Sequence, residues 1–341
     1  MQSEGQTVAG AVWADDFSTG FPTSGPDARW TYIGFGPHVA DDGIVHTSAR
    51  GLEVVSSGTN SATGEPAFVR TLAPEGVNPH GLPGLLDHLK WFAFADHEAS
   101  TGFPGFDAVP GQVLSGSAWL SGRTYGTHGH PFGDAVADPG ADLRLATVTF
   151  NAVDPETSTV FNLFLTNTRI YAFYERLPNQ RAELGPYAAF SYAIPVAERS
   201  PDDRHHLEIA YDRSAGTVRW LVDGREVFRV TDIGVPLDSR RHLLLDHGGP
   251  ARRTEPRQLR FGIGMLTLLD ARLDGRPALV RLVRSPGFYV DPVARPDGNS
   301  GENPPSFLDE DSRETSRLFG QGAALRVSRF EVSRTPAEEG S

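Results

Sequence analysis

The stretch from 159 to 176 carries the side chains whose types and spacing best suit chemistry. Hydrophobic and polar residues alternate along it on either side of a short turn. A period of two places alternate side chains on one face of a strand. One face of the second half then carries Arg169, Tyr171, Phe173 and Glu175. Tyrosine and arginine can polarise a carbonyl and a carboxylate can act as general base, so we predict Glu175, Tyr171 and Arg169 as catalytic residues.

Aromatic and amide side chains around this trio are candidates for ligand binding. An aromatic surface with a few directional polar groups is typical of sites for small molecules. The same rings also suit an ordinary protein core with a self-satisfied Arg–Glu pair, and both interpretations stay open at this stage. The predicted ligand-binding residues are Asn162, Phe164, Phe173, Tyr187, Tyr192, Trp91, Trp119, His128 and His130.

Histidines in the Gly- and Pro-rich loops raise the question of a metal. His128 and His130 with Asp134 form a set of two imidazoles and one carboxylate, and Asp-His pairs recur at 87–88 and 246–247. Histidines in such loops more often make hydrogen bonds within turns, so the metal stays unknown. Calcium is the alternative, because oxygen ligands are plentiful. Neither a P-loop nor a G-x-G-x-x-G turn is present, so we expect no organic cofactor.

Strands must position these side chains, and the clearest strands lie between 206 and 230. Leu207, Ile209 and Tyr211 alternate with polar residues, and Asp223-Gly224 is typical of a two-residue hairpin turn. The chain also contains 37 glycines and 26 prolines, which favour many short strands over helices. Further strands are predicted at 66–72, 89–98, 112–122, 143–150, 159–166, 169–176, 187–194, 259–266 and 324–333.

Composition restricts the partners and the compartment. The net charge is −12 and there is no basic block, so nucleic acid and membrane surfaces are not expected partners. The 341 residues include no cysteine, which excludes disulfides, thiolate metal sites and a cysteine nucleophile. The first residues lack the pattern of a signal peptide, so we expect a cytoplasmic protein. The sequence does not determine the oligomeric state.

The chain is expected to form one domain with loose ends. We predict a flexible N-terminus at 1–14, a single β-sandwich at 15–334 and a flexible C-terminus at 335–341. Within the domain, residues 285–322 form a long polar stretch that we interpret as an insert or a lid.

The order of these segments resembles the concanavalin A-like lectin/glucanase superfamily. The resemblance rests on Asp15-Asp16-Phe17 with Trp30, on W-x-V-D-G-x-x-V at 220–227, and on a last strand like Leu325–Val332. Residues 166–178 and 187–197 are similar to an uncharacterised actinobacterial family within it. The resemblance implies an all-β fold, a two-sheet antiparallel jelly-roll sandwich with long loops. It implies no reaction, because the E-x-D-x-x-E strand of family 16 glycoside hydrolases is absent.

Three functions from different classes are compatible with this sequence. The first is an intracellular enzyme of bacterial secondary metabolism that cyclises or isomerises a small molecule in a concave aromatic cleft. The second is a lectin-like protein that binds a carbohydrate or small molecule without catalysis. The third is a glycoside hydrolase with displaced carboxylates, for which Asp96 with Glu98 and Glu208 with Asp212 are the nearest pairs on one strand face. Solvated strand polarity explains those pairs equally well.

Overall fold

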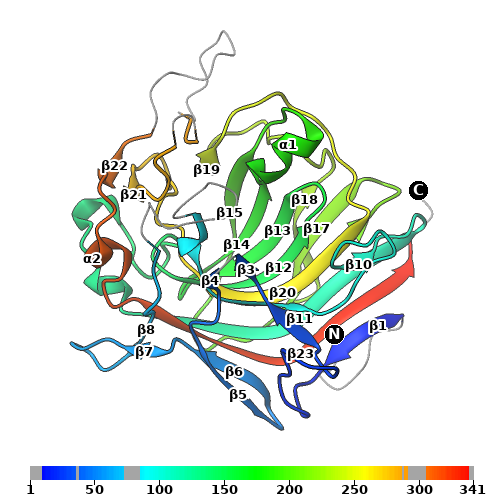
Figure 1. Cartoon of the computed structure of the whole chain (residues 1–341), viewed down its shortest axis with the longest axis horizontal. Coiled ribbons are helices and arrows are strands. Elements are labelled where there is room, and N and C mark those ends of the chain that lie inside the picture. Colours follow the sequence, from blue (N-terminus) through cyan, green and yellow to red (C-terminus); the bar gives the residue numbers. More distant parts are fainter. Residues whose placement is uncertain (1–9, 36–37, 73–84, 286–287, 291–304, 338–341) are drawn as a thin grey trace.

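Two large antiparallel sheets make up most of the computed structural model (Figure 1). The structure describes residues 10–35, 38–72, 85–285, 288–290 and 305–337. The expected fold class, a two-sheet antiparallel β-sandwich, is confirmed. Among the described residues, no helix is both long enough and apolar enough to cross a membrane.

The first sheet, sheet A, has eight strands in the order β18-β17-β16-β11-β23-β6-β5, and β1 also pairs with β23. Its longest members, β11 and β23, lie side by side at the centre and come from opposite halves of the chain. The strands are β1 (Ala11–Asp15), β5 (Ile44–Ser48), β6 (Gly51–Val55), β11 (Gln112–Tyr125), β16 (His205–Asp212), β17 (Thr217–Val222), β18 (Arg225–Val230) and β23 (Gly322–Pro336).

The second sheet, sheet B, has nine strands in the order β19-β15-β14-β13-β12-β20-β9-β2, and β10 also pairs with β20. It contains the predicted catalytic strand, β14, near its middle. The strands are β2 (Trp30–Tyr32), β9 (Leu89–Ala95), β10 (Phe106–Asp107), β12 (Thr147–Asp154), β13 (Thr159–Leu165), β14 (Arg169–Arg176), β15 (Phe190–Glu198), β19 (Leu243–Asp246) and β20 (Gln258–Leu266).

Short elements complete the fold. Three two-stranded pieces are β3 (Gly34–Phe35) with β4 (His38–Val39), β7 (Gly58–Thr59) with β8 (Pro66–Ala67), and the parallel pair β21 (Ala278–Val280) with β22 (Phe307–Asp309). The helical turns are η1 (Leu85–His88), η2 (Thr127–Gly129), η3 (Gly133–Ala135), η4 (Pro178–Gln180), α1 (Arg181–Leu184) and α2 (Glu314–Arg317).

The predicted hairpins between 206 and 230 form as expected. Asp223 and Gly224 have φ angles of 54° and 77°, the left-handed pair that a two-residue hairpin with matched twist requires. Alternate residues of β16 and β17 point into the space between the sheets, as a buried face demands. A bulge interrupts this alternation in β18, where Val227 and Phe228 both pack against the core.

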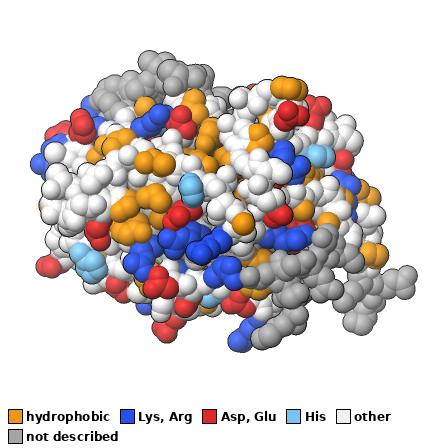
Figure 2. Space-filling view, turned by 90° about the horizontal axis from the view of Figure 1, so that it is seen from below, with side chains coloured by type: hydrophobic (Ala, Val, Ile, Leu, Met, Phe, Trp, Pro, Cys, Tyr) orange, Lys and Arg blue, Asp and Glu red, His pale blue; other side chains and the backbone are white. Residues whose placement is uncertain are grey.

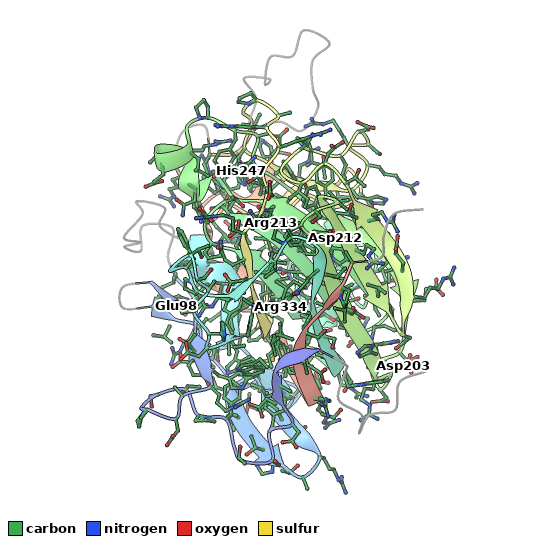
Figure 3. All side chains as sticks on the ribbon, turned by 90° about the vertical axis from the view of Figure 1, so that its right-hand side faces the viewer. Glu98, Asp203, Asp212, Arg213, His247 and Arg334 are labelled. Carbon is green, nitrogen blue, oxygen red and sulfur yellow. The ribbon has the colours of Figure 1, made fainter. Side chains whose placement is uncertain are left out.

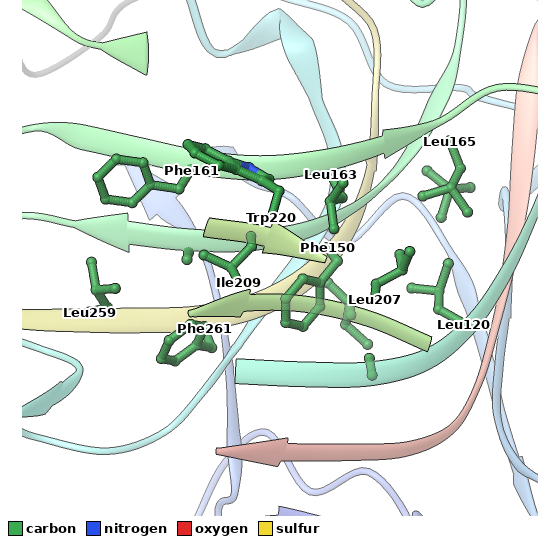
Figure 4. Packing of buried hydrophobic residues seen from close by; sticks show 14 of the residues in the cluster. Leu120, Phe150, Phe161, Leu163, Leu165, Leu207, Ile209, Trp220, Leu259 and Phe261 are labelled. Atoms are coloured by element: carbon green, nitrogen blue, oxygen red, sulfur yellow. The ribbon is translucent and has the colours of Figure 1, made fainter. Parts of the chain in front are cut away.

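The main core lies between the two sheets (Figure 4). Phe161 of β13 packs edge-on against Trp220 of β17, with ring centroids 5.8 Å apart. The Trp220 indole N–H donates to the Asn162 carbonyl at 3.0 Å, so this large ring is buried without losing a hydrogen bond. This core fixes which face of β13 and β14 points away from sheet A.

Several predicted boundaries differ from the structure for local reasons. The predicted strand at 66–72 shortens to β8, because the backbone N–H groups of Val69 and Arg70 donate to the Asp42 carboxylate instead of to a ladder. Strand β1 begins inside the stretch predicted to be flexible, and pairs with β23. Of the predicted insert or lid, residues 286–287 and 291–304 lie outside the described residues, so the lid role stays a prediction.

The face of sheet A that points away from the core carries paired charges. In Figure 2, basic side chains gather near the middle of the visible surface, beside acidic ones. On β11 and β23, Arg123 pairs with Asp202, Arg326 with Glu53 and Arg329 with Glu331. Exposed pairs of this kind contribute little to stability.

Candidate functional site

The outer face of sheet B, the face turned away from sheet A, brings the predicted residues together in rows that cross the strands. One row contains Asn162 and Phe173, and the next contains Phe164 and Tyr171. A third row, one step further along the strands, contains Glu175. The predicted alternation of faces in β13 and β14 is therefore correct.

Two of these three rows are covered by the protein itself. Asn162, Phe164, Tyr171 and Phe173 are all less than 5% exposed. The segment 267–285, which follows β20 and which we call the covering segment, packs on them in a second hydrophobic cluster through Leu268, Ala271, Ala278 and Val283. These four predicted residues therefore form a core under the covering segment, rather than an open binding surface.

Glu175 keeps part of its surface exposed, as does Arg169 at the other end of β14. The Glu175 carboxyl group is nevertheless deeply enclosed, and burial raises its pKa to about 7. Its Oε1 accepts a hydrogen bond from the Ser191 hydroxyl at 2.5 Å, and nearby His88 opposes the rise. A carboxyl group with a pKa near neutrality can both donate and accept a proton under cellular conditions.

An imidazole held by a carboxylate lies close enough to interact electrostatically with Glu175. His88 Nε2 lies 3.1 Å from Asp270 Oδ1, and Tyr289 donates its hydroxyl to Asp270 Oδ2 at 2.6 Å. Burial alone would lower the pKa of His88, but Asp270, with smaller contributions from Asp87 and Glu175, outweighs burial and the pKa is raised. Burial would likewise raise the pKa of Asp270, but His88 and the Tyr289 hydroxyl lower it.

The exposed fractions of the His88 and Asp270 side chains indicate different roles for these two residues. The Asp270 side chain is fully buried, whereas 12% of the His88 side chain is exposed. A ligand on this face could reach His88 and Glu175 but not Asp270. Asp270 therefore orients and charges His88, as the carboxylate does in other Asp–His pairs.

Backbone hydrogen bonds place this cluster against the sheet. His88 ends η1, and its carbonyl accepts from the Thr267 N–H at 3.0 Å, which joins η1 to the start of the covering segment. The Tyr289 hydroxyl in turn accepts from the N–H groups of Leu282 and Val283. Asp270 and Tyr289 therefore lie over the sheet because the covering segment folds back across it.

A second buried histidine borders the cluster. His247 follows β19 and lies near α1 in Figure 3, and Arg181 of α1 contacts its carbonyl at 3.1 Å. Its Nδ1 lies 2.6 Å from the Phe288 carbonyl oxygen. Burial lowers the pKa of His247, so this ring is neutral at pH 7. It shapes the end of the site rather than adding a charge to it.

Tyr171 and Arg169 do not have the geometry of the predicted catalytic roles. The Tyr171 hydroxyl donates to the Ala141 carbonyl at 2.9 Å, and burial raises its pKa to about 12. Arg169 lies near Tyr171, at the opposite end of β14 from Glu175. Of the predicted trio, the structure leaves Glu175 as the residue placed for chemistry.

Four aromatic residues predicted to bind ligand lie elsewhere. Trp91 and Tyr192 are fully buried between the sheets, because they have the opposite strand parity from Phe92 and Ser191. Tyr187 is also buried, with the Arg176 guanidinium 3.9 Å from its ring centroid. The fourth, Trp119, lies on the outer face of sheet A beside His206.

The two loop histidines do not join the cluster. His128 is exposed in η2, and His130 stacks on Phe132 with ring centroids 6.1 Å apart. Across the residues that the structure describes, no three His, Cys, Asp or Glu side chains are grouped to hold a metal ion. The predicted calcium has no assigned ligands in that part of the chain.

The carboxylate pairs that the sequence suggested for glycoside hydrolysis do not meet on sheet B. Glu98 is exposed in a loop after β9, and Asp212 lies on β16 of sheet A; Figure 3 shows them well separated. The carboxylate that does lie near Glu175 is Asp270. Sequence reasoning missed Asp270 and Tyr289, because nothing local marks a residue that folds back over a sheet from a distant part of the chain. Ser191 was missed although it lies on the neighbouring strand β15, directly opposite Glu175.

Comparison with known proteins agrees with the scarcity of functional signals. A protein named uncharacterized protein L829, from Acanthamoeba polyphaga mimivirus, is 28% identical over 406 residues, covering 94% of this chain and 87% of its own. Among solved structures, an endo-1,3-beta-glucanase from Streptomyces sioyaensis is similar with a TM-score of 0.44 and 13% identity, covering 96% of each chain. A laminarinase catalytic domain from Thermotoga petrophila has a TM-score of 0.40 and 10% identity, covering 96% of this chain and 98% of its own.

Likenesses at this level carry no argument about activity. A family model matches this chain from residue 14 to residue 336. By that match, the chain belongs to DUF6081, a family of unknown function.

Proposed function

We propose that this protein is an enzyme that moves protons within a small molecule bound on the outer face of sheet B. The observation that carries the proposal is Glu175, a partly exposed residue whose enclosed carboxyl group has a pKa of about 7 and lies beside an imidazole that a buried carboxylate charges. General acid–base catalysis works best when the pKa lies near the operating pH. Placing such a group in a protein interior costs stability, which a purely structural residue would not need to do.

Two proton carriers on one face suit a cyclisation or an isomerisation. Both reactions remove a proton from one atom and deliver a proton to another. In the proposed scheme, ionised Glu175 removes the first proton and His88, held protonated by Asp270, supplies the second. The step needs neither a nucleophile nor an organic cofactor, in keeping with the expectation from sequence.

A test compares the chain with its Glu175→Gln variant on natural metabolites. Both proteins are incubated in D2O with an extract of a bacterium that carries a member of this family, and products are separated by chromatography and mass spectrometry. We expect one or more compounds to isomerise or gain deuterium with the wild type and not with Glu175→Gln. The matched control is Glu198→Gln, at the exposed end of β15, which should act like the wild type. Identical traces for wild type and Glu175→Gln would refute the proposal.

Glycoside hydrolysis is a second candidate, supported by one observation. Glu175 and Asp270 are neighbouring carboxyl groups whose pKa values are shifted in opposite directions, as in glycosidases that assign one group to the acid role and one to the ionised role. Against it stands the complete burial of Asp270. Release of reducing sugar from laminarin or agarose, lost in both Glu175→Gln and Asp270→Asn, would favour this candidate over isomerisation.

A further inference from the structure

The row of side chains that passes through Glu175 differs from its two neighbours on the outer face of sheet B. Reading across the strands, the register runs from Arg260 to Val153, Val160, Glu175 and Ser191. Arg260, Val153 and Glu175 each retain exposed surface, whereas Val160 and Ser191 of the same row are buried. In the next two rows, Asn162, Phe164, Tyr171 and Phe173 are buried. A ligand would therefore meet Arg260, Val153 and Glu175 first.

Arg260 is a cation without a close partner at one end of the row. Its guanidinium carbon lies 4.3 Å from the centroid of the Phe94 ring, and burial lowers its pKa to about 10. Asp96 favours the charge, but no ion pair joins it to Arg260 among the described residues. The Nε atom is buried without a hydrogen-bond partner. A guanidinium has five donors in a planar fork, so this one is open to an anion.

A glycine lets the aromatic ring lie beneath that cation. A Cβ atom on Gly262 would come within 2.7 Å of Phe94 Cδ1 and 2.4 Å of the Ala93 carbonyl oxygen. Without a side chain at 262, the Phe94 ring approaches β20 closely, and the Arg260 guanidinium lies over that ring. A supported guanidinium loses less freedom when it binds a ligand than a side chain that is free in solvent.

The middle of the row is apolar. Val153 and Val160 separate Arg260 from Glu175, and neither side chain can donate or accept a hydrogen bond. Glu175 lies three strands from Arg260, and strands in a sheet are 4.7–4.9 Å apart, so their backbones are separated by roughly 14 Å. A molecule that contacts both ends must be elongated, with an apolar body between them.

We propose that this row binds an elongated carboxylic acid with an apolar body. The carboxylate pairs with Arg260, the body lies on the partly exposed Val153, above the buried Val160, and the far end reaches Glu175. The role of Glu175 rests on the proposed function, but binding through Arg260 does not. The valines count against an acidic sugar, whose hydroxyl groups would need polar partners along the row. The protein's net charge of −12 repels anions, so binding should depend strongly on this local contact.

Calorimetric titration with decanoate tests the proposal, with decanamide as a neutral ligand of equal body length. We expect decanoate to bind the wild type more tightly than decanamide does. Arg260→Gln should weaken decanoate binding by roughly tenfold to a hundredfold, the usual loss for a charge-assisted hydrogen bond. Arg260→Lys, which retains the charge and guards against misfolding, should weaken it less. The matched control is Arg225→Gln, an exposed arginine on β18 of sheet A, which should leave binding unchanged.

Three outcomes would overturn this inference. They are no binding of decanoate to the wild type, equal binding of decanoate and decanamide, and equal binding of decanoate to wild type and Arg260→Gln. Binding of digalacturonate in place of decanoate would assign the row to acidic sugars and would also refute the apolar body. Glu175→Gln should still bind decanoate, so failure of the proposed acid–base chemistry is distinguishable from failure of this binding site.

Discussion

Replacing Glu175 by glutamine should make the protein more stable, and only above a certain pH. In the folded chain the carboxyl group has a pKa of about 7, against an ordinary value of 4.5. Glutamine has nearly the same shape and retains an oxygen that can accept the Ser191 hydrogen bond, but it cannot ionise. The substitution therefore removes the cost of a buried negative charge while the packing stays in place.

The sign and size of the effect follow from linkage. Between pH 4.5 and 7, the unfolded chain has lost the proton of Glu175 and the folded chain still holds it, so wild-type stability falls as pH rises. The two pKa values differ by about 2.5 pH units, and each unit corresponds to 1.36 kcal/mol, which gives a cost of about 3 kcal/mol above pH 7. Below pH 4.5 the side chain is neutral in both states and the cost disappears.

Urea unfolding followed by tryptophan fluorescence, at intervals from pH 4 to pH 8.5, measures this difference. The free energy of unfolding of Glu175→Gln minus that of the wild type should be near zero at pH 4 and rise to about 3 kcal/mol by pH 8. The matched control is Glu198→Gln, at the exposed end of β15. A pH-independent difference for Glu175→Gln would show that Glu175 titrates normally, and would remove the basis for its acid–base role.

Three further predictions test the surroundings of Glu175 and the corrected placements. NMR titration should give His88 a pKa above 6.5, and Asp270→Asn should bring it below 6.5, because burial then acts without the opposing carboxylate; an unchanged value would contradict the pairing. Tyr289→Phe should lower the free energy of unfolding by about 1–3 kcal/mol, since Asp270 and two backbone N–H groups lose their hydrogen-bond partner. A smaller loss, measured by chemical denaturation, would contradict the hydrogen bonds of the Tyr289 hydroxyl. Trp91→Ala should cost about 3–5 kcal/mol and Trp119→Ala much less, because Trp91 is fully buried and Trp119 is not; similar losses in urea unfolding would contradict the placement of both rings.

The sequence was most reliable where local alternation and turn chemistry decided the structure. The strand predicted at 169–176 has those bounds in the structure, and the Asp223-Gly224 turn forms as expected. Alternation also placed Glu175 on the correct face of β14. The prediction of ligand-binding residues failed at Trp91 and Tyr192. An aromatic ring suits a core and a ligand site equally well, and only its position in the strand alternation shows which face of the sheet it occupies.

The remainder of the candidate site depends on contacts between distant parts of the chain. His88, Asp270 and Tyr289 come from separate loops, and their pKa values respond to one another only after those loops meet. No spacing along the sequence signals such a meeting. The same holds for the covering segment, whose leucines and alanines hide Phe164 and Tyr171 from any ligand.

By itself, then, the order of polar and apolar residues determined that this chain forms two antiparallel sheets, and which side chains of β13 and β14 point outward. Period and turn type are local properties, so a single sequence contains them. Tertiary structure alone decided which outward side chains stay accessible, and which carboxyl group sits in an enclosure that raises its pKa. Burial and electrostatic coupling depend on what packs against a residue from elsewhere in the chain, and that is settled only when the fold closes.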